Sequence, residues 1–124
     1  MRPAHSLGEI QLLHGRFPDH IKLFAAYQGD ALLAGVLVYE HRRVAHAQYT
    51  SAGEEGKRLG ALDLVFDHLL SEQYRGHDYF DFGISTEEQG QVLNVGLAEQ
   101  KEGFGGRAVV HDFYELDLVA SAAA

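Results

Sequence analysis

The chain has 124 residues, the length of one domain, and its net charge of −8 argues against binding to nucleic acid or to an anionic membrane. It contains no cysteine, which excludes disulfides and thiolate metal ligands. The longest apolar run, Ala31–Tyr39, is too short to cross a bilayer, and residues 1–19 show no signal-peptide core. We therefore expect a single cytoplasmic domain over residues 1–124, with its core at about 20–116.

A short helix is predicted near the N-terminus. Ser6 and Glu9 have the spacing of a capping box, in which a hydroxyl and a carboxylate bond free backbone N–H groups at the start of a helix. The apolar side of this helix would consist of Ile10, Leu12, Leu13 and Phe17. Pro18 ends the pattern, because its ring cannot continue a helix.

Three strands joined by short turns are predicted next, at 20–28, 31–40 and 44–50, and they form an antiparallel meander. Gly29 and Asp30 supply the first tight turn. The second strand is apolar on both faces, as in a strand that is covered on both sides. In the third strand, strict alternation places Val44, His46, Gln48 and Thr50 on one face and Ala45, Ala47 and Tyr49 on the other.

The pattern then changes to a helical period. Ser51 and Glu54 repeat the capping-box spacing, and apolar residues recur three or four positions apart between Lys57 and Tyr74. These residues are Leu59, Leu62, Phe66 and Leu69, with Val65 and Leu70 widening the stripe. We predict one continuous helix here, followed directly by a buried strand at Tyr79–Phe82. A helix between two strands of one sheet makes those strands parallel.

The rest of the chain continues this alternation. A helix is predicted over Gln91–Gly103, a last strand over Arg107–Leu116 and a disordered tail over residues 117–124. The element order is therefore α-β-β-β-α-β-α-β. It defines an α/β (α+β) fold with a mixed sheet and helices on its faces.

Most motifs that carry chemistry are missing. The 8 histidines have no metal-ligand spacing, so no metal site is expected. Asp81, Ser85 and either His46 or His111 supply the residue types of a hydrolytic triad, but there is no Gly-x-Ser-x-Gly elbow. Neither of the two common glycine motifs that bind nucleotide phosphates is present.

One stretch favours an anion. Residues 54–61 leave a strand and open the long helix, where unpaired backbone N–H groups and the helix dipole attract negative charge. The stretch also contains two glycines and two cations, Gly56, Gly60, Lys57 and Arg58. Glu54 and Glu55 oppose an anion, so the alternative is a stretch that only caps the helix. Asn94, near the start of the next helix, offers an amide to a polar ligand or serves as an ordinary capping residue.

Three stretches carry a resemblance to a known family. They are Asp81-Phe82-Gly83-Ile84-Ser85, Asn94-Val95-Gly96-Leu97 and Lys101-Glu102-Gly103-Phe104-Gly105-Gly106. Together with the meander, the glycine-containing turn and the long helix, they resemble the GNAT superfamily of N-acyltransferases, and most closely its FemAB-like branch. The resemblance covers about residues 20–116.

The resemblance implies transfer of an acyl group from a thioester, acetyl-CoA or another acyl-CoA, to a small-molecule or peptide amine. The donor's pyrophosphate would bind at the turn formed by Gly56, Lys57, Arg58, Leu59 and Gly60. Thr50 and Asn94 would line its pantetheine arm. His46 or Glu87 would accept the proton of the amine, with Asn94 beside the reacting centre. FemAB relatives take the acyl group from aminoacyl-tRNA instead.

The chain also departs from the family pattern. The pyrophosphate turn has Glu55 at its first position and Arg58 in place of a glycine, and only Gly60 matches. The tyrosine that often acts as general acid has no counterpart, although Glu99 or Lys101 falls nearby. The elements that normally precede the meander are reduced to one short helix, so the fold is expected to be N-terminally truncated. Either the chain is a C-terminal piece of a longer protein or it completes its sheet with a second copy, and an uncovered sheet edge favours a homodimer. The same departures support a rival hypothesis, a non-catalytic module for self-association or partner binding.

Overall fold

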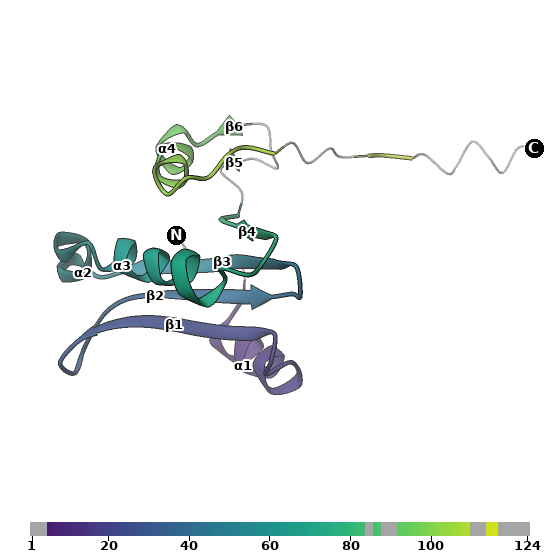
Figure 1. The fold of residues 1–124 in the computed structure, drawn as a ribbon. Coiled ribbons are helices and arrows are strands. Elements are labelled where there is room, and N and C mark those ends of the chain that lie inside the picture. The colour runs from purple at the N-terminus through teal and green to yellow at the C-terminus, as the bar shows by residue number, and fades with distance from the viewer. Residues whose placement is uncertain (1–4, 84–85, 88–91, 110–113, 117–124) are drawn as a thin grey trace, which may run out of the picture.

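The computed structural model describes residues 5–83, 86–87, 92–109 and 114–116. In chain order, its elements (Figure 1) are α1 (Leu7–Arg16), β1 (Ile21–Gln28), β2 (Ala31–Glu40), β3 (Val44–Ala52), α2 (Glu54–Leu59), α3 (Ala61–His68), the π-helical turn η1 (Leu69–Gln73), β4 (Tyr79–Asp81), β5 (Thr86–Glu87), β6 (Val92–Leu93) and α4 (Val95–Gly103). The described strands form a larger sheet of β1 to β4 and a small sheet of β5 and β6.

The larger sheet has the strand order β1-β2-β3-β4. β1 and β2 are antiparallel, as are β2 and β3, whereas β3 and β4 are parallel. Gly29 adopts a φ of +60° in the β1–β2 turn, a conformation that glycine reaches without strain. The predicted meander and the parallel pair are both confirmed.

The first capping box is confirmed as well. The Ser6 hydroxyl accepts from the Glu9 N–H at 3.2 Å, and the Glu9 carboxylate accepts from the Ser6 N–H at 3.4 Å. These bonds fix the start of α1, which packs against β1.

One face of the larger sheet carries the core, and we call it the covered face because α3 and η1 pack on it. Its buried side chains come from both layers: Val36, Val38, Ala45 and Ala47 from the strands, and Val65, Phe66, Leu69 and Tyr74 from the helical side. Leu69, Val36 and Val38 are the largest fully buried side chains. Burial of one such side chain stabilises the fold by about 1.5–3 kcal/mol.

The opposite face of the sheet, here called the open face, is much less covered. Cross-strand pairing places Leu23 of β1, Leu37 of β2 and Tyr49 of β3 in one row on it. Leu23 is 69% exposed, in contrast to the fully buried leucine of η1. The two faces of the same strands therefore have very different surroundings.

A β-bulge in β3 corrects the predicted alternation of its side chains. Leu37 pairs with Tyr49 while Val38 pairs with Ala47, so Gln48 has no partner in β2. The extra residue reverses the alternation, because facing residues of antiparallel strands share a face. Tyr49 therefore lies on the open face with His46, and the prediction that it shares a face with Ala47 is wrong.

The predicted continuous helix is also wrong. Gly60 has a φ of +69°, and this left-handed residue ends α2 and begins α3. The α3 segment then passes into the π-helical turn η1 at Leu69. Ser51 belongs to β3, and Gly53 precedes α2 without any side-chain cap, so the second capping box does not form.

The C-terminal part differs from the prediction at the start of its helix and in the region of the last strand, whereas the helix ends at Gly103 as predicted. α4 starts at Val95 rather than at Gln91, after the β6 strand. Of the predicted last strand, residues 107–109 and 114–116 are not in a strand, and residues 110–113 lie outside the described part of the chain. Phe104 joins this region to the core, since its ring lies 4.7 Å from that of Phe66 in α3 and 6.0 Å from that of Phe82.

Candidate active site

β3 and β4 separate partway along β3. Their paired residues are Val44 with Tyr79, Ala45 with Phe80 and His46 with Asp81. β4 ends at Asp81, whereas β3 continues to Ala52 (Figure 1). Among the described residues, no strand pairs with Ala47–Ala52 on the β4 side. This segment, the open edge of β3, offers backbone N–H and C=O groups to a ligand.

A histidine and an aspartate lie where the strands separate. The His46 Nδ1 atom is 2.8 Å from Asp81 Oδ2, and His46 Nε2 is 2.9 Å from Gln48 Oε1. The other carboxylate oxygen of Asp81 accepts from the Gly83 N–H at 2.8 Å. Gly83 has a φ of +87°, which explains why a glycine stands at this turn. Asp81 is therefore held in place on both oxygens, and it orients the imidazole.

The contact with Asp81 orients the imidazole ring. An ionised carboxylate only accepts hydrogen bonds, so His46 Nδ1 donates to Asp81. This arrangement leaves Nε2, beside the Gln48 side chain, as the ring nitrogen that a general base would use.

Lys101 of α4 adds a basic group to this region. Burial lowers the pKa of Lys101 below its usual value, and attraction to the Asp81 carboxylate partly opposes that shift. A side chain on Gly83 would meet the His46 ring and the Lys101 Nζ atom within 4.0 Å, which places both groups beside the same turn. The sequence indicated Lys101 only as a residue near the missing tyrosine.

The residues proposed for the donor's pyrophosphate lie on α2 and just after it. Lys57, Arg58 and Leu59 are all exposed. Arg58 forms a two-pronged ion pair with Glu55 of the same helix, which lowers the pKa of Glu55. The glutamate that opposed an anion in the sequence is thus neutralised by a neighbouring arginine.

The packing of α2 against β2 explains why residue 56 is a glycine. It is buried, and a Cβ atom at this position would lie 2.0 Å from the Leu33 carbonyl oxygen of β2. The close approach that this glycine permits is therefore between α2 and β2. Gly60 serves the break between α2 and α3, and Thr50 is exposed on β3 opposite Val36.

The remaining candidates belong to the small sheet and α4. Asn94 caps α4, since its side-chain oxygen accepts from the Leu97 N–H at 3.0 Å, so the capping interpretation of this residue is confirmed. Glu87 is in β5, where it pairs with Val92 of β6. Ser85 and His111, the other members of the possible triad, lie outside the described residues.

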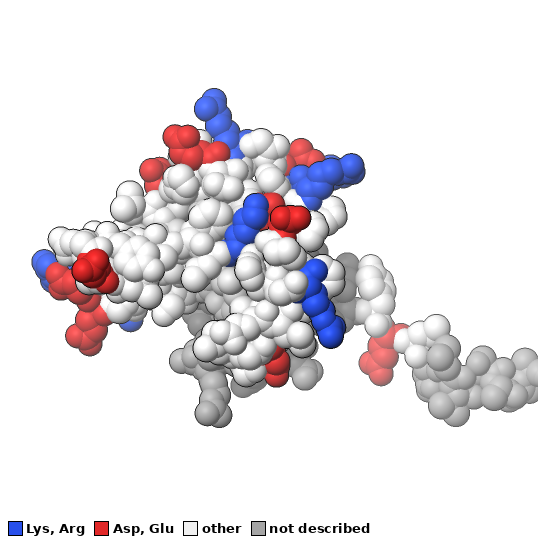
Figure 2. Space-filling view, turned by 90° about the horizontal axis from the view of Figure 1, so that it is seen from below, with Lys and Arg blue, Asp and Glu red and all other residues white. Residues whose placement is uncertain are grey.

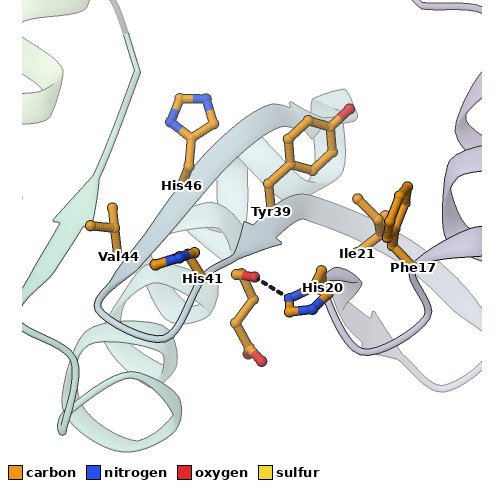
Figure 3. Close-up of a pocket in the computed structure, with 8 residues that line it drawn as sticks. Phe17, His20, Ile21, Tyr39, His41, Val44 and His46 are labelled. Atoms are coloured by element: carbon orange, nitrogen blue, oxygen red, sulfur yellow. Dashed lines mark hydrogen bonds between the residues drawn. The ribbon is translucent and has the colours of Figure 1, made fainter.

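A shallow, open pocket on the open face was not indicated by the sequence. It has a volume of about 370 Å³ and lies at the end of the sheet near the β2–β3 turn (Figure 3). Its lining residues are Phe17, His20, Ile21, Tyr39, Glu40, His41, Val44 and His46. Ile21, Tyr39, His46 and Asp81 are successive partners across all four strands, so they form one row. The strand register is what brings these residues together, and a single sequence does not reveal that register.

Charges of both signs are mixed on the surface. The face shown in Figure 2 has acidic and basic side chains interspersed around a large uncharged area. No group of three or more His, Cys, Asp or Glu residues that could hold a metal ion occurs in the described part of the chain.

The fold and the site define a class of protein. A mixed sheet whose one parallel pair separates beside an oriented histidine has the architecture that the resemblance to N-acyltransferases implied. Residues 2–89 match the family model described as "Acetyltransferase (GNAT) domain". Because the match covers more than half of the 124 residues, the chain belongs to this family. It is an acyl-transfer domain of GNAT type.

The match includes β1 to β4 and stops before Asn94 and α4. No curated protein and no solved structure matches the chain. In the part of the chain that the structure describes, every helix is too short or too polar to cross a membrane.

Proposed function

We propose that this domain is an N-acyltransferase that moves an acyl group from acetyl-CoA or another acyl-CoA to an amine. Domains of this family generally use such a donor. The observation that carries the proposal is the separation of β3 and β4 next to His46 and Asp81. A donor needs an extended groove with hydrogen-bonding backbone, and the amine needs a base beside that groove. Both requirements are met within a few residues of each other.

The donor would bind along the open edge of β3. A pantetheine arm contains amide groups, which can bond the backbone of Ala47–Ala52 as an added strand would. Thr50 lies within this segment. The pyrophosphate would then reach α2 and the turn at Gly60 that ends it, where Lys57 and the backbone of residues 56–60 lie. The ion pair of Arg58 with Glu55 reduces the repulsion that the glutamate would otherwise exert.

The chemistry requires one bond to form and one to break. The nitrogen lone pair of the neutral amine attacks the thioester carbonyl carbon, and a C–N bond forms. The C–S bond then breaks, and its electron pair leaves with the sulfur. The proton released by the nitrogen passes to Nε2 of neutral His46, while Asp81 holds the ring through Nδ1. The thiolate takes up one proton, for which Lys101 is the candidate donor, so that amine and thioester yield amide and thiol.

Backbone N–H groups at the bulge would stabilise the developing oxyanion. Gln48 has no partner in β2 and lies two residues after His46, the last residue of β3 that pairs with β4. Bulges often re-aim backbone and side-chain groups next to active sites. A preorganised N–H donor at this point would act where charge develops in the transition state. Asn94, whose side chain caps α4, and Glu87 of β5 remain candidates on the far side of the separation.

An aminoacyl-tRNA donor, as in the FemAB branch, is the less favoured alternative. The net charge of −8 opposes long-range attraction to RNA. A non-catalytic module is the other alternative, and the departures in the pyrophosphate turn are its support. Both alternatives can be distinguished from the proposal by the binding and turnover experiments with acetyl-CoA described next.

The test combines ligand binding with turnover. Acetyl-CoA should raise the melting temperature, because a ligand that binds only the folded state stabilises it. Thiol release should then depend on an added amine. His46→Gln should lower kcat by about 100-fold, the lower range for loss of a general base, and should keep the thermal shift. His68→Gln is the matched control, since His68 is exposed on α3. Neither shift nor thiol release at millimolar donor would favour the non-catalytic module.

We also propose that the chain forms a homodimer through an edge of the larger sheet. β1 is an edge strand in the described sheet, and such an edge invites pairing with a second copy. Light scattering at micromolar concentration should give twice the mass of one chain. A monomeric mass would contradict the dimer without affecting the proposed chemistry.

A further inference from the structure

The side chain of Lys101 reaches the candidate active site from α4. A Cβ atom added to Gly83 would lie 4.0 Å from Lys101 Nζ, 3.8 Å from His46 Cε1 and 3.6 Å from the Ala47 carbonyl oxygen. The amino group, the imidazole ring and the first residue of the open edge of β3 are therefore arranged around one point. An amine of the protein itself lies beside the proposed base.

Contacts of its backbone hold Lys101 at this place. The Lys101 carbonyl oxygen accepts from the Phe104 N–H at 3.1 Å and from the Gly106 N–H at 3.0 Å, so the end of α4 is tied to the turn that follows it. The ring of Phe104 stacks on that of Phe82, and it also contacts Phe66 in the core. The position of the Lys101 side chain is thus fixed by core packing rather than by a surface loop.

The proposed donor would bring its thioester to the same point. Its pyrophosphate would lie at residues 56–60, beyond the Ala52 end of the open edge. Because the pantetheine arm would follow the open edge away from α2, the acyl group would lie toward the Ala47 end, next to His46 and Lys101. The Lys101 amino group therefore stands where the amine of an acceptor would attack.

We propose that Lys101 is a site of self-acylation, at which the domain transfers the acyl group of its donor to the Lys101 Nζ atom when no other amine is bound. This inference rests on the donor site of the proposed function. It assigns a covalent modification to one of the three lysines of the chain, Lys22, Lys57 and Lys101. The attached group is the acyl group of the thioester.

The surroundings of Lys101 favour the neutral amine that this reaction needs. Partial burial lowers the pKa of Lys101, and attraction to the Asp81 carboxylate opposes that shift without cancelling it. A lysine with a lowered pKa has a larger fraction of nucleophilic amine at neutral pH. The other two lysines differ, since Lys22 bonds the Glu40 carboxylate at 3.0 Å and Lys57 is exposed.

The reaction balances without a further reagent. The lone pair of the neutral Nζ atom attacks the thioester carbonyl carbon and forms a C–N bond, and the C–S bond breaks with its electron pair on sulfur. The proton lost by the nitrogen passes to His46 Nε2 and from there to the thiolate, so the products are N-acyl-lysine and free thiol. Because an amide is a poorer acyl donor than a thioester, the acyl group then stays on Lys101.

Mass spectrometry of the intact chain tests the proposal. With acetyl-CoA and no added amine, the wild type should gain one acetyl group, and digestion should place it on Lys101. Its rate should exceed that of Lys57 at least about 100-fold, the lower range for a positioned base. Lys101→Arg should abolish this fast reaction, whereas the matched control Lys22→Arg, which keeps a cation opposite Glu40, should react as the wild type does. Equal rates at all three lysines would overturn the proposal.

Two further measurements separate transfer within the folded site from spontaneous acetylation. His46→Gln should slow the acetylation of Lys101 by about 100-fold, because the proton acceptor is lost. In urea, where the site is lost, Lys101 and Lys57 of the wild type should react at similar rates. An unchanged rate in His46→Gln, or a preference for Lys101 that persists in urea, would show that the folded site does not carry out the transfer.

An assay with added amines distinguishes failure of this inference from failure of the proposed function. Acetylation of Lys101 without transfer to any added amine would retain self-acylation and refute transfer to a free acceptor. Transfer to an added amine with Lys101 unmodified in the absence of amine would retain the transferase and refute self-acylation. Neither reaction at millimolar acetyl-CoA would refute both.

Discussion

The two faces of the larger sheet are built by the same strands and differ in almost every physical respect. On the covered face, Val36, Val38 and Leu69 are fully buried against α3 and η1. On the open face, Leu23 is exposed and polar groups such as His46 and Tyr49 line up between apolar neighbours. Strands alternate their side chains, so a single strand serves both faces. One face supplies stability, and the other carries the candidate base His46.

The bulge at Gln48 changes which side chains of β3 face the core. Before the bulge, Ala45 and Ala47 point into the core, and after it Tyr49 points out. The shift occurs one residue beyond Ala47, where β3 has already lost its partner β4. Stability is thus concentrated where the strands are paired, and the candidate chemistry begins where pairing ends.

The largest effect on stability should come from truncating a buried side chain on the covered face. Leu69→Ala should lower the free energy of unfolding by about 2–5 kcal/mol, because it removes a fully buried side chain and leaves a cavity. Leu23→Ala, the equivalent change on the open face, should cost less than about 1 kcal/mol. Urea denaturation of both variants measures the difference. A large cost at Leu23 would show that the open face is covered in solution, by a second copy for example.

The next effect concerns the contact between α2 and β2. Gly56→Ala should lower the free energy of unfolding by about 3 kcal/mol, since the added Cβ atom would overlap the Leu33 carbonyl oxygen and force the helix away. Gly15→Ala is the control within a helix, because nothing lies within 4 Å of a Cβ atom there. That control should be neutral or stabilising by up to about 1 kcal/mol. If both variants unfold alike in urea, α2 does not pack on β2 as described.

A third effect is on turnover rather than on stability. Asp81→Asn should lower kcat/KM about tenfold, equivalent to about 1.4 kcal/mol of transition-state stabilisation, because the neutral amide no longer stabilises the protonated His46 ring. Asp78→Asn is the matched control, since Asp78 pairs with Arg43 on the exposed surface nearby. Steady-state kinetics distinguish the two. Equal losses in both variants would mean that Asp81 only supports the fold.

The smallest effect is a pH dependence at Glu40, on the covered face of the sheet. Burial acts to raise the pKa of Glu40, but hydrogen bonds from Lys22 and Tyr74 together with the charge of Lys22 leave that pKa below its usual value of 4.5. A lowered pKa means that the stabilisation is complete above pH 4.5 and is lost as the pH falls through the folded-state value. Glu40→Gln should remove this loss, which is at most about 1 kcal/mol. Melting temperatures from pH 6 to pH 3 test it, with the exposed Glu72→Gln as control.

Local rules predicted the local features. Ser6 and Glu9 gave the start of α1 because a capping box depends only on neighbouring residues. The meander followed from short turns such as Gly29–Asp30. The break at Gly60 was missed because glycine is tolerated inside a helix, and only the packing of α2 and α3 on the sheet requires its left-handed conformation.

The site was only partly predictable for the same reason. His46 was recognised as a candidate base, but its pairing with Asp81 depends on the register of β3 against β4, 35 residues apart in the chain. The bulge at Gln48 depends on β2, and the pocket depends on Phe17, Ile21 and Tyr39 meeting from three elements. Between β4 and α4, candidate residues were indicated by the family resemblance. Among them, Asn94 has a local role that the structure shows, because its side chain caps α4.

The most direct test is amide hydrogen exchange with and without acetyl-CoA. We expect slower exchange in Ala47–Ala52, at those amides that are not already bonded to β2, and in residues 56–60. The core residues Val36 and Val38, which pair with both β1 and β3, should change little. Unchanged exchange along Ala47–Ala52 at saturating donor would contradict the claim that the separation of β3 and β4 is the donor site.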